Sequence, residues 1–95
     1  PQMAIAAMVV REVYRELDAG SSCTITSAND SKHSTGSLHY QGKALDFRTH
    51  DFQGDKKELV HMCKEALGPH FDVLLEGLGT PNEHLHVEHD VKEAP

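Results

Sequence analysis

The chain has 95 residues, of which 38% are hydrophobic and 25% charged, and its formal net charge is −6 with histidine neutral. This length and composition predict a single globular domain over residues 1–95 and exclude a disordered chain. The acidic excess argues against a nucleic-acid partner, since phosphate binding needs a basic stripe. No apolar run is long enough to span a membrane.

In chain order, apolar residues at helical spacing first predict a helix over 3–19, ended by Gly20. Residues that follow this spacing include Ile5, Met8, Val9, Val13 and Leu17. The helix lacks the flanking residues of a signal peptide. β-Branched residues predict a strand over 23–28, and turn-forming residues predict a long loop over 29–42.

Alternating residues predict a strand over 43–49, and an apolar stripe predicts a helix over 55–67. Two more strands are expected over 71–76 and 84–90, followed by a frayed tail. The residues expected to face the core from the two alternating strands are Leu45, Phe47, Leu85 and Val87. The fold class is therefore α+β, with a small, mainly antiparallel sheet packed against helices.

The two cysteines, Cys23 and Cys63, fit neither a disulfide framework nor a zinc-ribbon spacing. We expect both to be buried thiols, because a free cysteine behaves as a small hydrophobic residue; the alternative is a single bridge between them.

Histidines and carboxylates gather on the polar faces of two predicted strands. Asp46 lies on one strand, seven residues after His39, and His84 and His86 lie on the other, directly after Glu83. Two imidazoles and a carboxylate form a catalytic zinc set, and residues i and i+2 of a strand share one face. Zinc lowers the pKa of a bound water to about 7, and a carboxylate near it can take the proton. A solvated strand face is the alternative, and another divalent metal would also fit.

Residues Ser37–Asp46 match the pattern Ser-x-His-x-x-Gly-x-Ala-x-Asp at every fixed position. This pattern resembles the zinc site of the D-alanyl-D-alanine carboxypeptidases and dipeptidases of peptidase family M15. With the later His-x-His pair, the chain also resembles the hedgehog signalling domain over roughly residues 23–90. The resemblance implies a hedgehog/D-Ala-D-Ala peptidase-like fold, one zinc ion, and hydrolysis of peptidoglycan stem peptides by a carboxypeptidase or endopeptidase.

The same resemblance implies a role for each matching residue. His39, Asp46 and His86 would be the zinc ligands, Glu83 the general base, and His84 the group that binds or polarises the scissile carbonyl.

The family's upstream Arg or Gln is missing, and Lys32, His33 or Arg48 are candidates to replace it. His33 is preferred as an extra residue of the cleft, and Ser37 is expected to orient the loop by hydrogen bonding. The histidines outside the motif, expected to serve packing or the surface, are His50, His61, His70 and His89.

Hedgehog domains also bind calcium, but of the acidic positions only Asp30 matches, so calcium is not expected. We expect a monomer whose partner is the peptidoglycan peptide, acting on the cell wall as a phage or an exported bacterial protein. The alternative is a catalytically inactive, hedgehog-like zinc-binding module in a phage or cell-wall protein. The bond specificity and the export route stay open.

Overall fold

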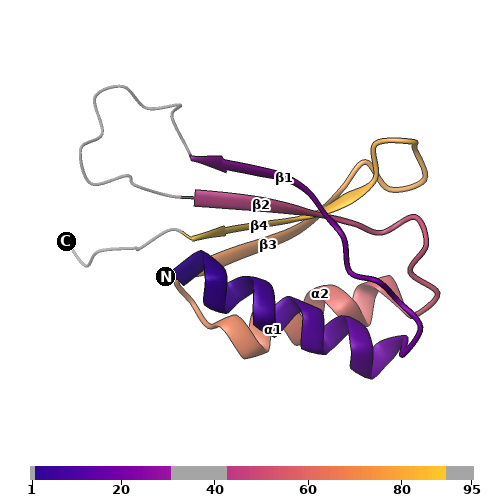
Figure 1. The fold of residues 1–95 in the computed structure, drawn as a ribbon, viewed down its shortest axis with the longest axis horizontal. Coiled ribbons are helices and arrows are strands. Elements are labelled where there is room, and N and C mark those ends of the chain that lie inside the picture. Colours follow the sequence, from indigo (N-terminus) through magenta and orange to yellow (C-terminus); the bar gives the residue numbers. More distant parts are fainter. Residues whose placement is uncertain (1, 31–42, 90–95) are drawn as a thin grey trace.

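The computed structural model describes residues 2–30 and 43–89. Its elements are α1 (Gln2–Leu17), β1 (Ile25–Asp30), β2 (Lys43–Arg48), α2 (Lys56–Leu67), β3 (Phe71–Glu76) and β4 (His84–His89). The strands form one antiparallel sheet in the order β1-β2-β4-β3, and both helices lie on the same side of it (Figure 1). The predicted α+β class with an antiparallel sheet packed against helices is confirmed.

The element boundaries agree with the sequence to within one residue except at α1 and β1. Helix α1, predicted over 3–19, ends at Leu17, and β1, predicted to begin at residue 23, begins at Ile25. This strand was predicted to end at residue 28, but Asn29 and Asp30 continue it by pairing with Ala44 and Lys43 of β2. Pairing with a neighbouring strand therefore overrides the loop preference of these two residues. The rest of the predicted loop, 31–42, and the predicted tail lie outside the described residues.

The central strands divide the sheet into a core face and an outer face. Leu45, Phe47, Leu85 and Val87 are buried beneath the helices, as the alternation predicted. The helices contribute further core residues, namely Ala6, Val10, Val13, Tyr14, Leu59 and Cys63. Because side chains alternate along a strand, Asp46 of β2 and the His-x-His pair of β4 occupy the outer face, away from the helices.

The buried face of α1 differs in part from the predicted one: Val13 is buried and Leu17 packs against the core as expected, but the first turns differ. Ile5 and Met8 are 60% and 67% exposed, whereas Ala6, Val10 and Tyr14 are fully buried. Residues 3–10 are apolar on every side of the helix, so their spacing does not single out one face. Contacts with the rest of the fold determine which face of α1 is buried. Among them is the hydrogen bond that the Tyr14 hydroxyl donates to the backbone carbonyl of Arg48 at 2.8 Å.

Helix α2 begins and ends as the sequence predicts. The Asp55 side chain caps its start by accepting hydrogen bonds from the backbone N–H groups of Lys57 and Glu58. Gly68 ends it with a φ of 89°, a conformation that glycine adopts without strain. In the described part of the chain, no helix is both long and apolar enough to cross a membrane.

The two cysteines are free thiols in different surroundings. Cys63 is buried, as predicted, whereas Cys23 is only half-buried. Burial raises the pKa of the Cys63 thiol to about 12 and that of the Cys23 thiol to about 11. Both are therefore protonated near neutral pH, which does not suit a reactive thiol or a metal ligand.

Candidate metal centre

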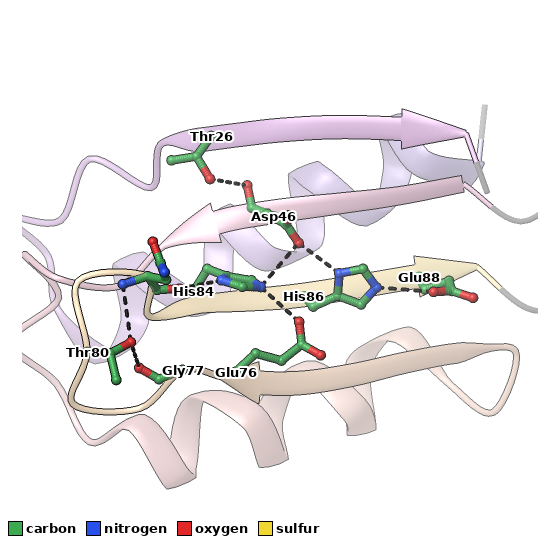
Figure 2. A network of polar contacts seen from close by, with 9 residues as sticks. Thr26, Asp46, Glu76, Gly77, Thr80, His84, His86 and Glu88 are labelled. Atoms are coloured by element: carbon green, nitrogen blue, oxygen red, sulfur yellow. Dashed lines mark hydrogen bonds and ion pairs between the residues drawn. The ribbon is translucent and has the colours of Figure 1, made fainter. Parts of the chain in front are cut away.

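Strand register brings the candidate ligands of two strands together on the outer face of the sheet. Asp46 of β2 pairs directly with His86 of β4, and His84 follows on the same face. On the other side of β4, His84 pairs with Glu76 of β3. Directly opposed residues on one face of an antiparallel pair lie within side-chain contact. Figure 2 shows His84 between the carboxylates of Asp46 and Glu76, and His86 between those of Asp46 and Glu88.

The atoms able to bind a metal converge at one point of this face. One donor atom each from Asp46, His84 and His86 lies within 4.8 Å of the other two. Asp46 Oδ1 is 2.8 Å from His86 Nδ1 and 3.8 Å from His84 Nε2. Among the described residues, these three form the group that could hold a metal ion.

The spacing of these atoms fits a tetrahedral ion. Zinc binds nitrogen and carboxylate oxygen at about 2.0–2.2 Å, so two tetrahedral ligand atoms are separated by roughly 3.3 Å. The contacts of 2.8 Å and 3.8 Å made by Asp46 Oδ1 bracket that separation. Both contacts of Asp46 therefore lie within about 0.5 Å of the zinc spacing, and the donor atoms of all three residues lie within 4.8 Å of one another.

Every nitrogen of the two rings faces an oxygen atom (Figure 2). His84 Nδ1 is 2.6 Å from the carbonyl of Asn82, and its Nε2 is 2.8 Å from Glu76 Oε1. His86 Nδ1 faces Asp46, and its Nε2 is 3.1 Å from Glu88 Oε1. A neutral imidazole has only one N–H. Each ring is thus placed to carry a second proton or to bind a cation.

These contacts raise the pKa of both histidines. For His84 the hydrogen bond to the Asn82 carbonyl is the main cause, and the bond to Glu76 adds to it against the opposing effect of burial. For His86 burial acts to lower the pKa, but the bonds to Glu88 and Asp46 outweigh it. The local field therefore favours positive charge between the two strands.

The cluster is open to solvent through a hollow on each side. One hollow of about 590 Å³ is lined by Asp46, His84 and Arg48 among others. A second, of about 740 Å³, reaches His86 and Leu74 from the other side of β4. An extended molecule could therefore approach the cluster along the sheet.

The predicted general base lies in different surroundings. The Glu83 carboxylate accepts hydrogen bonds from the Thr49 hydroxyl, the Lys56 ammonium group and, at 3.1 Å, the backbone N–H of Gly79. Its side chain is only 5% exposed. The bonds from Lys56 and then Thr49 lower its pKa to about 2, against the effect of burial. Glu83 is thus a buried, ionised carboxylate that links the start of α2 to the β3–β4 turn through hydrogen bonds. It does not belong to the group of three donor atoms.

Of the other predicted site residues, Arg48 is exposed beside the cluster, two positions from Asp46. His33, Ser37, His39 and the side chain of Asp30 lie outside what the structure describes. The remaining histidines keep their expected surface or packing roles. Among them, His50 contacts the carbonyl of Pro81, and His89 packs against the ring of Phe71.

Two contacts of the site were missed from the sequence, those of Glu76 and Glu88. The alternation His-x-His-x-Glu predicts Glu88 on the same face as the two histidines. The structure places it there, and only its contact with His86 was not predicted. Glu76 lies on another strand and meets His84 only through the β3–β4 register, which no local pattern in the sequence encodes.

Comparison with models of protein families, with curated proteins and with solved structures finds no significant match to this chain.

Proposed function

We propose that this chain binds one zinc ion on the outer face of its sheet and hydrolyses peptidoglycan stem peptides, as a member of the hedgehog/D-alanyl-D-alanine peptidase superfamily. The observation that carries the proposal is the convergence of the Asp46, His84 and His86 donor atoms within 4.8 Å of one another. The motif from Ser37 to Asp46 supports the same assignment from the sequence.

Asp46 and His86 are the two ligands on which the motif and the donor cluster agree. The motif makes His39 the third ligand and gives His84 a place beside the metal, where it would orient the substrate carbonyl. The cluster offers His84 itself as an alternative third ligand. A zinc ion held there would polarise a peptide carbonyl and lower the pKa of a water ligand.

A carboxylate is also needed to accept a proton from the attacking water. The motif assigns this role to Glu83, which would have to leave Lys56 and Thr49 to perform it, because both hold its carboxylate. Glu76 is a second candidate, since it already lies on the outer face, 2.8 Å from His84 Nε2. Activity of Glu83→Gln and Glu76→Gln variants would separate the two.

The ligand assignment is tested by zinc titration against a chromophoric chelator. We expect one zinc per chain, with a loss of at least 100-fold in affinity for Asp46→Asn and His86→Ala. His39→Ala and His84→Ala distinguish the third ligand, because the true ligand gives the larger loss. His61→Ala, an exposed histidine on α2, is the matched control and should bind zinc normally. Wild-type protein that binds no zinc would refute the proposal.

The activity is tested on stem peptides ending in D-Ala-D-Ala, with products identified by mass so that internal cuts are also detected. Zinc-dependent cleavage that is lost in His86→Ala and retained in His61→Ala would support a peptidase. Zinc binding without cleavage would favour the second candidate, an inactive zinc-binding module. One observation already favours that module, namely that Lys56 holds the buried Glu83 carboxylate in a partly buried ion pair.

A further inference from the structure

In each histidine, the ring nitrogen that donates a hydrogen bond leaves the other ring nitrogen to bind a metal. A neutral imidazole has one N–H donor and one lone pair, whereas carboxylates and carbonyls accept hydrogen bonds. In His86, Nδ1 points toward Asp46 and the centre of the cluster, and Nε2 points outward to Glu88 at 3.1 Å. A metal bound at Nδ1 leaves the ring proton on Nε2, where Glu88 is in place to accept it.

His84 presents the opposite nitrogen. Its Nδ1 lies 2.6 Å from the backbone carbonyl of Asn82, which can only accept a hydrogen bond. Its Nε2 is the atom that points toward Asp46, at 3.8 Å. The two rings therefore approach the cluster centre through different nitrogens, although they are only two residues apart on one strand.

We propose that Glu88 is a positioning residue that holds His86 as an Nδ1 metal ligand, by accepting a hydrogen bond from Nε2–H. The inference rests on the proposed metal centre and deepens it. A carboxylate on the outer nitrogen of a ligand histidine fixes the ring and makes the inner nitrogen a better donor. Glu88 is suited to this task because it shares the outer face of β4 with His86 and its side chain is only 17% exposed.

Glu76 provides an internal comparison. It too lies within hydrogen-bond distance of one of the two histidines, but it contacts Nε2 of His84, which is the inner nitrogen. There it competes with a metal for the same nitrogen, because a carboxylate accepts a hydrogen bond only from a protonated Nε2, which has no lone pair left for a metal. The structure thus contains two His–Glu contacts with opposite expected effects on metal binding, one supporting a ligand and one opposing it.

The test measures zinc affinity for wild-type protein, Glu88→Ala, Glu88→Gln and Glu76→Gln, together with ¹⁵N chemical shifts of the histidine rings in the zinc-loaded protein. We expect Glu88→Ala to weaken zinc binding about 10- to 100-fold. Glu88→Gln, whose amide oxygen still accepts a hydrogen bond, should recover part of that loss, and Glu76→Gln should bind as tightly as wild type or more tightly. The ¹⁵N shifts should show zinc on Nδ1 of His86 and the proton on Nε2.

Zinc on Nε2 of His86, or Glu88→Ala binding zinc as tightly as wild type, would overturn the role of Glu88 and leave the metal centre intact. Wild-type protein that binds no zinc would overturn the metal centre itself, and this inference with it. The ¹⁵N spectra of the variants also report whether each is folded, so a loss of affinity is not confused with unfolding.

Discussion

The ion pair between Lys56 and Glu83 gives a direct test of whether Glu83 has a structural role. Replacing Lys56 with Met keeps the apolar stem but leaves the Glu83 carboxylate, 5% exposed, with only the Thr49 hydroxyl and the Gly79 N–H as donors. Breaking a fully buried pair costs roughly 3–5 kcal/mol. The Lys56 side chain is 29% exposed, so we expect a smaller loss of about 2 kcal/mol, typical of a hydrogen bond to a charged group.

Urea unfolding measures this loss. With a slope of about 1 kcal/mol per M for a small domain, the midpoint should fall by roughly 2 M. Lys57→Met is the matched control, because Lys57 is exposed on the same turn of α2, and its midpoint should stay nearly unchanged. In a double-mutant cycle, adding Glu83→Gln should recover part of the stability lost with Lys56, since no buried charge is then left unpaired. Equal midpoints for Lys56→Met and Lys57→Met would refute the assignment of Glu83 to a structural ion pair.

Three further predictions follow from named contacts. The pKa of Glu83 is lowered to about 2 in the folded protein, so its stabilising contribution should be complete above its ordinary pKa of 4.5 and be lost as the pH falls toward 2. Thermal unfolding across this range should therefore show that Glu83→Gln loses less stability in acid than the wild type does. Tyr14→Phe removes the buried hydroxyl that donates to the Arg48 carbonyl and should cost about 1 kcal/mol by urea unfolding; no change would show that this bond does not stabilise the fold. Zinc at a free concentration 100 times the wild-type dissociation constant should stabilise the wild type by about 2.7 kcal/mol but Asp46→Asn, which binds at least 100-fold more weakly, by no more than about 0.4 kcal/mol, as measured by thermal shift. Equal stabilisation of both would place the zinc elsewhere.

Local patterns in the sequence were sufficient for most of the fold. The bounds of β3 follow from the turn-forming residues on either side of it. The buried faces of β2 and β4 follow from alternation, since a strand has only two faces and Leu45 or Val87 must turn to the core. The buried face of the first turns of α1 did not follow, because these turns are apolar all round and offer no contrast, whereas Val13 further along is buried as predicted. There the choice depends on partners distant in sequence, such as the carbonyl of Arg48 for Tyr14.

The residues of the site also fall into those that local sequence patterns predict and those that depend on the folded chain. Asp46 and His86 could be named from motif spacing, and the β2–β4 register then places them directly opposite each other. The contact of Glu76 with His84 depends on the pairing of β3 with β4, and the ion pair of Glu83 depends on where α2 begins. Neither is a local property of the sequence, so both required the folded chain.

The measurement that tests the metal centre most directly is X-ray absorption at the zinc edge of protein loaded with one equivalent of zinc. We expect one tightly held zinc per chain, with a shell of nitrogen and oxygen at about 2.0–2.1 Å that includes imidazole, and loss of that signal in His86→Ala. A chain that retains no zinc, or a shell containing sulfur at about 2.3 Å, would contradict it, because sulfur would move the metal to Cys23 or Cys63 and away from the outer face of the sheet.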